Sequence, residues 1–577
     1  MTYDLKTLKS PSDLKKLDPD ELYVVAQELR AALLKKLSVR GGHVAPNLGV
    51  VEATVALHYV FDAPEDKIVF DVSHQSYVHK MITGRMEAFT DPAHYNDVTG
   101  YTCPAESPYD LFEMGHTSSS IALATGLAKA RDLTGGKENV IAFIGDASLG
   151  GGEALEALNF APTLHSNFIV ILNDNQMSIA ENHGALYPHL AELRATNGQA
   201  PYNIFRALGY EYIYVAEGND MRSLIRAFRE VKGTDGPVVV HINTMKGMGL
   251  PVAEAHKEEF HYHGPFELKS GAPLQPDSAE CYDDIFADRM LELMHDDKRV
   301  VVVNAGTPGS IGFTPERRAA AKNRFIDVGI AEQDAVAMSA GLAKAGCRPV
   351  MGVVATFLQR AYDQLSQEVA INRMPAVFVE FFTGMFGMND VTHLGFFDIA
   401  MVSNIPGILM LAPATAEEYV AMIDWAVKQT STPVVIRTPG GPVRHTDRPV
   451  NTDFTRYDVI RDGSGVAIIA AGPFLHTALE AAELMNASGI NPTVINPRIL
   501  SGVDGECLDS LRAYRHVITI EDGIIDGGFG QKVAAYLGTS PVKVTCLGLK
   551  KEFIDRFKVA DILKANNLTP PQIAALA

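Results

Sequence analysis

Two polar side chains stand at the ends of two apolar runs in the first third of the chain. Asp146 follows the run from Val140 to Gly145, and Asn175 closes the run from Phe168. Both runs are short, rich in β-branched residues and without polar alternation, which is typical of buried parallel strands. Carboxylate and amide oxygens are ligands that Mg²⁺ prefers, and Mg²⁺ commonly also takes phosphate oxygens. The pair therefore predicts a diphosphate site bridged by magnesium.

A glycine-rich turn, residues 146–152, separates the first run from a helical pattern over residues 153–160. The order is strand, turn, helix, strand, which directs backbone N–H groups toward an anion beyond the carboxyl end of the first strand. An ordinary crossover in which Asp146 caps a helix has the same pattern. The turn alone does not decide between the two interpretations.

Histidines mark three further segments that could take part in chemistry. His43 lies in a loop shaped by glycines and a proline (residues 41–49), and His74 follows a short strand at residues 67–71. Loops held by rigid elements often carry functional residues, although His74 could by its chemistry alone be a surface residue. The segment 256–264 is rich in histidine and contains His263. Adventitious metal binding is the alternative for that segment.

Composition limits the class of protein. The chain has 577 residues, of which 47% are hydrophobic and 21% charged, so we expect two to four domains of an ordinary globular type. The net charge of −19 argues against nonspecific binding to nucleic acid or to an anionic membrane. The sequence shows no long apolar run and no signal-peptide core. The five cysteines are scattered, and we expect a cytoplasmic protein that acts on small molecules.

The order of strand-like and helix-like segments predicts an α/β fold with three domains. We expect doubly wound domains at residues 1–270 and 280–445, and a smaller α/β domain at 453–577. A polar stretch rich in glycine and proline, residues 264–280, is interpreted as the linker after the first domain.

The histidine-bearing segments are nearly identical to those of a known family. Residues 41–85, the segment Glu106 to Asp110 and the segment Gly115 to Ser120 closely resemble the N-terminal region of 1-deoxy-D-xylulose-5-phosphate synthases. The GDA at 145–147 and the NDN at 173–175 resemble the GDG…N signature of thiamine-diphosphate enzymes, with Ala147 in place of the last glycine. The resemblance covers nearly the whole chain and implies a transketolase-like architecture of two cofactor-binding domains and a C-terminal domain.

The resemblance implies thiamine diphosphate and Mg²⁺ as cofactors. It assigns the metal to Asp146, Asn175 and the backbone carbonyl of Met177, and it puts His43, His74 and His263 in the active site. The residues that it places along the cofactor, in addition to His74 and Asn175, are Gly115, His116, Ser118, Gly145, Ala147, Ser148 and Lys246.

The second half of the chain carries a glutamate suited to cofactor activation. Glu332 follows a strand-like segment, residues 325–328, and an apolar setting there favours the protonated carboxyl. The resemblance implies that Glu332 exchanges a proton with the pyrimidine, that Phe357 stacks on the pyrimidine and that His393 is catalytic. It places Arg360, Asn389, Asp390 and Arg437 at the substrate.

The segments that bind the acceptor phosphate in the family are changed. Phe382 and Gly440 stand where the family has arginines, and Val354 replaces a tyrosine. Arg360, Arg437 and Arg444 are candidates to rebuild a phosphate site, because a phosphate dianion favours bidentate guanidinium groups.

Three functions therefore compete. The first is decarboxylation of pyruvate and transfer of the two-carbon fragment to glyceraldehyde 3-phosphate, giving 1-deoxy-D-xylulose 5-phosphate, an isoprenoid precursor. The second keeps the cofactor but uses another aldehyde or a ketose donor, and the third is an inert paralogue. Retention of six family residues argues against inertness: His43, His74, Asp146, Asn175, Glu332 and His393. The C-terminal domain resembles the transketolase domain that builds a homodimer.

Overall fold

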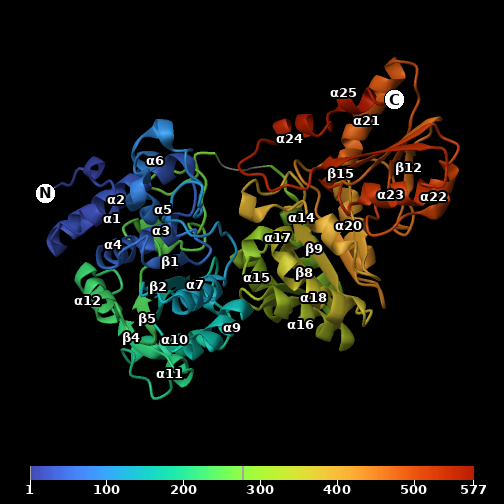
Figure 1. Cartoon of the computed structure of the whole chain (residues 1–577). Helices are drawn as coiled ribbons and strands as arrows, with labels where there is room; N and C mark the ends of the chain where they lie inside the picture. The colour runs from blue at the N-terminus through green and yellow to red at the C-terminus, as the bar shows by residue number, and fades with distance from the viewer. Residues whose placement is uncertain (1, 276–278) are drawn as a thin grey trace. The chain divides into compact units, whose positions relative to one another are not determined.

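Figure 1 shows the computed structural model of the chain, which describes residues 2–275 and 279–577. The chain forms two compact units. Unit 1 contains residues 1–277 and 329–331, and unit 2 contains residues 278–328 and 332–577.

Unit 1 is built on a five-stranded parallel sheet. The strands are β1 (Lys67–Phe70), β2 (Val140–Gly145), β3 (Phe168–Asp174), β4 (Glu211–Val215) and β5 (Pro237–Asn243). Their order across the sheet is β1-β2-β3-β5-β4. The predicted strands at 140–145 and 168–175 are thus confirmed as direct neighbours, because β2 pairs with β3 in parallel register.

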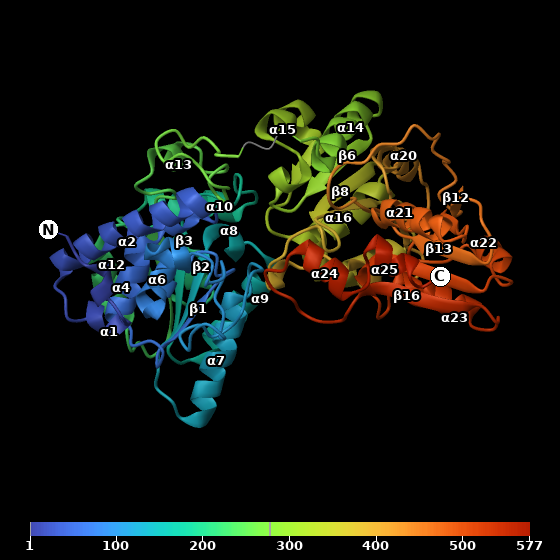
Figure 2. The ribbon, with the colours of Figure 1, turned by 90° about the horizontal axis from the view of Figure 1, so that it is seen from above.

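Helices bury both faces of this sheet. Figure 2 shows α2 (Pro19–Arg40), α4 (Val51–Val60) and α12 (Met221–Val231) on one side of the strands, and α7 (Ser120–Thr134), α9 (Gly152–Phe160) and α10 (Leu186–Ala195) on the other. Ile141 and Phe143 of β2 belong to one hydrophobic core, and Ala142 and Ile144 belong to the other. Two buried faces explain why the strand sequences are apolar throughout.

Three local differences from the sequence interpretation concern unit 1. The expected turn after β2 begins with a helical turn, α8 (Asp146–Leu149), and the expected loop at 41–49 contains α3 (Val44–Gly49). The expected linker at 264–280 begins as a packed segment, because Phe266 is buried in the core of unit 1. Residues 276–278 of that linker lie outside the described residues.

The first sheet of unit 2 is also parallel and has six strands. They are β6 (Val300–Asn304), β7 (Phe325–Asp327), β8 (Arg348–Val354), β9 (Val377–Phe381), β10 (Leu409–Leu411) and β11 (Val434–Arg437). The order is β10-β11-β9-β8-β6-β7. The helices α14 (Tyr282–Asp296) and α20 (Ala416–Ala426) contact each other, and α16 (Glu332–Lys344) packs on β6 and β8.

The second sheet of unit 2 contains β12 (Asp458–Arg461), β13 (Val466–Ala470), β14 (Thr493–Asn496), β15 (His516–Ile524) and β16 (Lys543–Leu549). The edge strand β12 pairs antiparallel with β14, and the remaining pairs are parallel. Ala467, Ile469 and Val517 share one core with the first sheet of this unit. The second and third predicted domains therefore pack as one unit, and the predicted α/β class with parallel sheets is confirmed.

The remaining α-helices are short or lie at the surface. They are α1 (Pro11–Leu14), α5 (Tyr77–Lys80), α6 (Glu87–Thr90), α11 (Ile204–Ala207), α13 (Pro251–Ala255), α15 (Pro315–Ala321), α17 (Ala355–Leu358), α18 (Tyr362–Gln364), α19 (Asp398–Val402), α21 (Phe474–Ala487), α22 (Gly505–Ser510), α23 (Phe529–Leu537), α24 (Val559–Ala565) and α25 (Pro570–Ala574).

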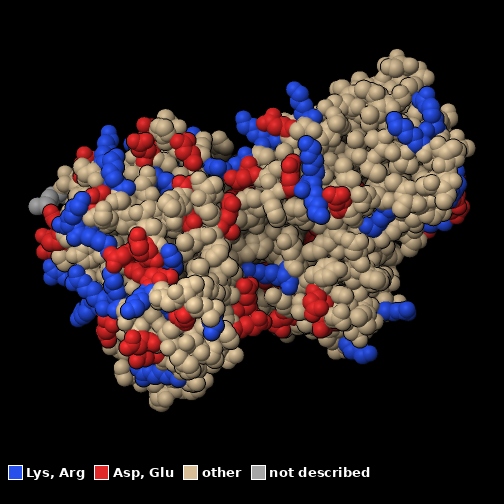
Figure 3. Space-filling view, in the orientation of Figure 1, with Lys and Arg blue, Asp and Glu red and all other residues tan. Residues whose placement is uncertain are grey.

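Acidic and basic side chains are interspersed over the face that Figure 3 shows. Within the described parts of the chain, no helix combines the length and the apolar character needed to cross a membrane.

Candidate active site

The three predicted magnesium ligands come together at the carboxyl edge of the first sheet. Gly145 of β2 pairs with Asn173 of β3, so Asp146 and Asn175 follow adjacent strand ends. Asp146 is buried and accepts a hydrogen bond from Asn182 Nδ2 at 2.8 Å. The Asn175 side-chain oxygen accepts from the backbone N–H of Met177 at 3.1 Å, which holds the loop bearing the Met177 carbonyl close to Asn175.

The donor set fits a magnesium ion that also binds phosphate. Among the described residues, no group of three or more His, Cys, Asp or Glu side chains is arranged to hold a metal. A cation here would rely on one carboxylate, one amide oxygen, a backbone carbonyl and oxygens of a ligand, which is a mode that Mg²⁺ favours. Burial and the neighbouring carboxylate of Asp174 raise the pKa of Asp146, and a divalent cation would stabilise its ionised form.

A second loop is fastened beside this edge by Asp71, which follows β1. The Asp71 carboxylate accepts from the backbone N–H groups of Ser118 at 2.8 Å and Ser120 at 3.0 Å. The Ser118 hydroxyl donates to the carbonyl of Ser148 at 2.8 Å, and a Cβ at Gly151 would lie 2.2 Å from that hydroxyl. Only glycine permits this close approach of the two loops.

The predicted diphosphate-side residues lie on these two loops. Gly115, His116 and Ser118 precede α7, whereas Gly145, Ala147 and Ser148 surround the start of α8. Of these residues, Gly115, Ser118, Ala147 and Ser148 are buried, and His116 and Gly145 are half-buried.

Lys246 brings a positive charge to the same edge. Its ammonium group is buried, donates to the carbonyl of Ser178 at 2.6 Å and lies 3.2 Å from Nδ1 of His261. Burial lowers the pKa of Lys246 to about 7, and the negative charge of Asp146 opposes that decrease. The arrangement suits an anionic ligand, which would restore the charged form of the lysine.

Three histidines form a cluster beside Lys246. The ring centroids of His43 and His74 are 5.1 Å apart, and the ring of His261 lies 5.7 Å from His43 and 5.5 Å from His74. Tyr101 and Tyr262 contact the ring of His43 at 5.8 and 5.2 Å. His43, His74 and His261 are called the histidine cluster below.

His263, which the sequence analysis placed in the active site, has a different position. Its ring stacks on Phe260 at 4.7 Å and meets Phe266 edge-on at 5.2 Å, and its Nδ1 lies 2.8 Å from the carbonyl oxygen of Gly264. His263 therefore packs against the core, and His261 is the histidine of this segment that reaches His43 and His74. Phe260 and Phe266 flank His261 as well as His263 in the sequence, so the sequence alone does not distinguish the two histidines.

Asn47 holds the two loops of the histidine cluster together. Its fully buried side-chain amide donates to the carbonyls of His43 at 2.8 Å and His74 at 2.7 Å. Its oxygen accepts from the backbone N–H of Tyr77 at 3.0 Å. The sequence analysis did not single out Asn47, because an asparagine in a loop beside glycines is usually a turn former.

Unit 2, taken by itself, contains a buried carboxyl group. Glu332 begins α16 and is 4% exposed, and its Oε2 accepts no hydrogen bond from the described residues. Nη1 of Arg360 lies 3.9 Å from this oxygen. Burial raises the pKa of Glu332, against the opposing effect of Arg360. A buried carboxyl oxygen without a hydrogen bond suits a ligand nitrogen such as that of an aminopyrimidine.

Phe357 and His393 contact each other near the carboxyl ends of β8 and β9. Their rings meet edge-on with centroids 5.7 Å apart. The hydroxyl of Thr392 lies 2.8 Å from Nδ1 of His393 and donates to Asp390 at 2.5 Å. Asp390 therefore orients His393 through Thr392, which differs from the substrate contact that the sequence analysis assigned to it.

Asn389 and Arg437 also differ from the predicted substrate contacts. Asn389 is exposed and donates to the carbonyl of Phe557 at 3.2 Å. Arg437 is 2% exposed, and its guanidinium forms ion pairs of 2.6 Å with both Asp398 and Asp522. Because the guanidinium of Arg437 is already paired with two carboxylates, its position does not support the prediction that Arg437 binds substrate.

The positions that lack the expected arginines are closed or apolar. Phe382 is 41% exposed and adopts a positive φ of 55° at the end of β9. A Cβ at Gly440 would lie 2.5 Å from the Cβ of Phe386. A side chain at position 440 would thus displace Phe386.

Family models match almost the entire chain. Residues 5–203 and 195–244 match the model described as 1-deoxy-D-xylulose-5-phosphate synthase. Residues 281–445 match the transketolase pyrimidine-binding domain, and residues 456–573 match the transketolase C-terminal domain. A transketolase structure from Pichia stipitis aligns with 97% of both chains at 16% identity and a TM-score of 0.45, which is too distant to add to these assignments.

Curated relatives extend over the same length. The 1-deoxy-D-xylulose-5-phosphate synthase of Pelotomaculum thermopropionicum is 37% identical, with 99% of this chain and 96% of the relative aligned. The 1-deoxy-D-xylulose-5-phosphate synthase 1 of Geobacter sulfurreducens is 38% identical over 96% of this chain and 93% of the relative. The synthase of Heliobacterium modesticaldum is 37% identical over 100% of this chain and 95% of the relative. The chain therefore belongs to the 1-deoxy-D-xylulose-5-phosphate synthase family of transketolase-like transferases.

Proposed function

We propose that the protein decarboxylates pyruvate and joins the two-carbon fragment to glyceraldehyde 3-phosphate, giving 1-deoxy-D-xylulose 5-phosphate and carbon dioxide with uptake of one proton. The observation that carries the proposal is the match of residues 5–244 to the synthase model, combined with the histidine cluster beside Lys246. A different aldehyde, a ketose donor or an inert paralogue is less favoured, because relatives that match nearly the whole chain carry the synthase name.

Asp146, Asn175 and the carbonyl of Met177 would hold Mg²⁺, and Lys246 would compensate the charge of the diphosphate of thiamine diphosphate. Support comes from their common position at one sheet edge. The groups proposed to surround the diphosphate are Gly115, His116, Ser118, Gly145, Ala147 and Ser148. When bound, thiamine diphosphate supplies a nucleophilic carbon and an electron sink for decarboxylation of a 2-keto acid.

Glu332 would hold a proton at the pyrimidine, and Phe357 would pack against that ring. Burial raises the pKa of Glu332, so its carboxyl group can donate a hydrogen bond that an ionised carboxylate cannot. This is the same physical device by which other buried carboxyls remain protonated donors near neutral pH.

The histidine cluster would handle protons on the substrate oxygens. A neutral imidazole can accept or donate a proton near neutral pH, and the acceptor carbonyl needs one proton as it becomes an alcohol. We assign to His261 the role that the sequence analysis gave to His263, because His261 contacts both other histidines. Within unit 2, His393 is oriented through Thr392 and Asp390 and would act as a separate proton donor or acceptor.

The acceptor phosphate would depend on groups other than the family's two arginines. Arg360 is the candidate that lies near Glu332, and Arg444 has an exposed side chain. Each charge-assisted hydrogen bond contributes roughly 1.5–3 kcal/mol, so we expect a high Michaelis constant for glyceraldehyde 3-phosphate.

The test is product formation by purified protein supplied with thiamine diphosphate, Mg²⁺ and pyruvate. Glyceraldehyde 3-phosphate should give 1-deoxy-D-xylulose 5-phosphate, identified by mass and NMR, with stoichiometric carbon dioxide. Parallel arms contain unphosphorylated glyceraldehyde, or xylulose 5-phosphate in place of pyruvate. Turnover only in one of these arms would assign a different acceptor or donor, and no turnover in any arm would favour the inert paralogue.

We further propose a cytoplasmic homodimer with domains at residues 1–270, 280–445 and 453–577. The family models fall within these ranges, and the five cysteines are free thiols. Light scattering coupled to size-exclusion chromatography checks the oligomeric state, and a monomer at assay concentration would contradict it.

A further inference from the structure

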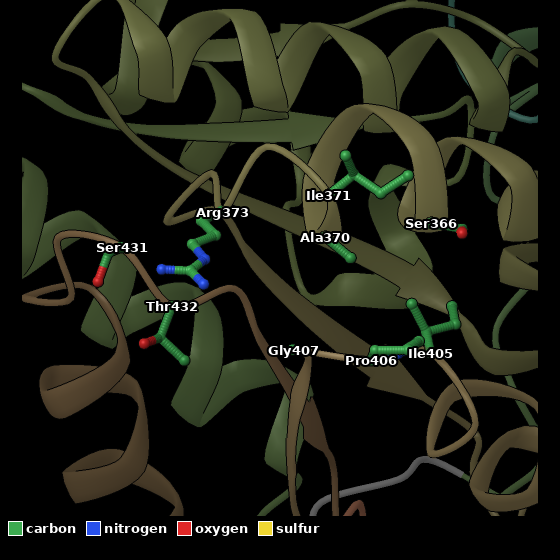
Figure 4. A pocket seen from close by; sticks show the side chains of 9 residues that line it. All are labelled: Ser366, Ala370, Ile371, Arg373, Ile405, Pro406, Gly407, Ser431 and Thr432. Atoms are coloured by element: carbon green, nitrogen blue, oxygen red, sulfur yellow. The ribbon is translucent and has the colours of Figure 1, made fainter.

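A pocket lies at the amino ends of three neighbouring strands of unit 2. Its volume is 480 Å³, which is within the range of small-molecule sites. The lining residues are Ser366, Ala370, Ile371, Arg373, Ile405, Pro406, Gly407, Ser431 and Thr432 (Figure 4). These segments precede β9, β10 and β11, whereas Phe357 and His393 follow the carboxyl ends of β8 and β9. The pocket is thus at the opposite edge of the sheet from these two residues.

Arg373 is the one ionisable residue among those that line the pocket. Its side chain is exposed, and neither a hydrogen bond nor an ion pair joins its guanidinium to any residue in the described parts of the chain. Most other arginines of unit 2 whose contacts are resolved have carboxylate partners, as Arg289 does with Asp424 at 2.7 Å. The pocket therefore contains a positive charge that the protein itself does not neutralise.

The backbone at Arg373 is held in a conformation that favours glycine. Its φ is 52°, and its N–H donates to the carbonyl of Ala370 at 3.0 Å after the π-helical turn Leu365–Ala370. Glycine or asparagine is usual at such a left-handed helix end, because a longer side chain costs free energy there. Residues in such conformations cluster at ligand sites, which makes Arg373 a candidate for ligand binding.

The one charged group of the pocket lies apart from its apolar side chains. Figure 4 shows Arg373 on the same side as the hydroxyl-bearing Ser431 and Thr432, and Ala370, Ile371 and Ile405 on the other side, together with the hydroxyl of Ser366. Ile371 is 68% exposed, which leaves an apolar surface next to the guanidinium. A ligand that satisfies both sides needs an anionic head and an apolar body.

We propose that this pocket binds a small organic phosphate, with the phosphate on Arg373, Ser431 and Thr432 and the apolar body on Ile371 and Ile405. One guanidinium and two hydroxyls supply donors for three oxygens, which suits a phosphate better than a carboxylate with two. The inference does not depend on the proposed function, because it concerns a separate edge of the sheet and a binding reaction only.

The test is calorimetric titration of full-length protein, loaded with thiamine diphosphate and Mg²⁺, with monobutyl phosphate. We expect saturable binding that is at least about ten-fold weaker in Arg373→Gln, the loss that one charge-assisted hydrogen bond predicts. Arg515→Gln is the matched control, because Arg515 is an exposed arginine of the same unit, and it should bind like the wild type. Inorganic phosphate, butyrate and 1-butanol should each bind more weakly than monobutyl phosphate.

Equal affinity in the wild type and Arg373→Gln would place the ligand elsewhere and overturn the proposal, as would absence of saturable binding to the wild type. Tighter binding of butyrate would also overturn it, in favour of a carboxylate site.

Two further variants separate binding from folding. Arg373→Gly relieves the backbone conformation, so it should melt at the wild-type temperature or above while losing affinity for monobutyl phosphate. A lower melting temperature would mean that Arg373 has a structural role and would contradict the inference. Ile371→Ser should weaken the binding of monobutyl phosphate but leave the binding of inorganic phosphate unchanged. Equal weakening of the binding of both ligands would refute the assignment of the apolar body to Ile371.

Discussion

The carboxyl edges of the two large parallel sheets use charged residues in opposite ways. At the edge of the unit 1 sheet, Lys246 contacts a carbonyl and a histidine but forms no direct ion pair with any residue that the structure describes. At the edge of the first unit 2 sheet, Arg437 is enclosed by Asp398 and Asp522. Both cations are buried, Arg437 as the last residue of β11 and Lys246 in the turn after β5, and the sequence analysis assigned both to ligands. The difference shows that the partner, more than the position, decides whether a buried cation is free for chemistry.

The same contrast holds for the carboxyl groups of unit 2. Glu332 has an oxygen that accepts no hydrogen bond from the described residues, and Nη1 of Arg360 lies 3.9 Å from that oxygen. Glu380 is fully buried, and neither of its carboxyl oxygens accepts a hydrogen bond from the described residues. It lies beside Asp398 and Arg437 of the ion-pair network. We infer a ligand for the first carboxyl and a purely structural setting for the second.

The largest expected effect is on turnover of Glu332→Gln. The variant keeps the shape of the side chain but cannot exchange a proton, so kcat should fall by about 10²–10⁴-fold with the melting temperature nearly unchanged. Steady-state kinetics and thermal denaturation measure the two quantities. Asp334→Asn, an exposed position on the same helix, is the control, and a variant Glu332→Gln with more than half the wild-type kcat would contradict the assignment.

Replacing Arg437 by methionine should lower the free energy of unfolding. Removal of one partner from a buried ion pair costs about 3–5 kcal/mol, because Asp398 and Asp522 would remain buried without their cation. Chemical denaturation monitored by circular dichroism measures this loss. If Arg437→Met were as stable as the wild type and only raised the Michaelis constant for the acceptor, Arg437 would after all be a substrate-binding residue.

Asn47→Ala should uncouple the two loops of the histidine cluster. It removes two donated hydrogen bonds and one accepted bond, each contributing about 0.5–1.5 kcal/mol. We expect kcat to fall about ten-fold or more with thiamine diphosphate affinity retained, measured by kinetics and calorimetry. Asn404→Ala changes an exposed asparagine in unit 2 and should leave both unchanged. Equal losses of cofactor affinity and kcat would indicate general unfolding of the edge.

The smallest expected effect is the contribution of Glu380 to the pH dependence of the free energy of unfolding. Burial and the negative charge of Asp398 raise the pKa of Glu380 well above its ordinary value of 4.5. The folded state then binds more protons than the unfolded state, so stability falls as pH rises above the ordinary value, by at most about 1.4 kcal/mol per pH unit. Glu380→Gln should gain stability relative to the wild type between pH 5.5 and pH 8. A stability difference that is constant with pH would show that Glu380 titrates normally.

Sequence patterns predicted the elements that bear the metal ligands more closely than those around the histidines. Helix α2 begins after Asp18, whose side chain accepts hydrogen bonds from the backbone N–H groups of Asp20 and Glu21; this acidic residue followed by a proline is a local helix-start pattern. The predicted loop at 41–49 instead contains α3, for which His43 is the N-cap residue. Gly41 and Gly42 precede this helix and Gly49 ends it, whereas Pro46 lies in its first turn, where the missing N–H of a proline removes no intrahelical hydrogen bond. Strand β10 was not among the predicted segments, whereas the equally short β7 coincides with the strand-like segment predicted at 325–328.

What the sequence by itself determined is the neighbourhood of Asp146 and Asn175. Each follows a continuous apolar run, and parallel strands joined by a short helical crossover commonly lie side by side with their carboxyl ends at one edge. What only the tertiary structure decided is which of several like residues faces a ligand. His261 and His263 are separated by one residue, yet the first reaches His43 and the second stacks on Phe260. Arg437 has the residue type of a phosphate ligand but is paired with carboxylates from α19 and β15. Such choices depend on contacts between segments far apart in the chain, which local periodicity and residue type do not encode.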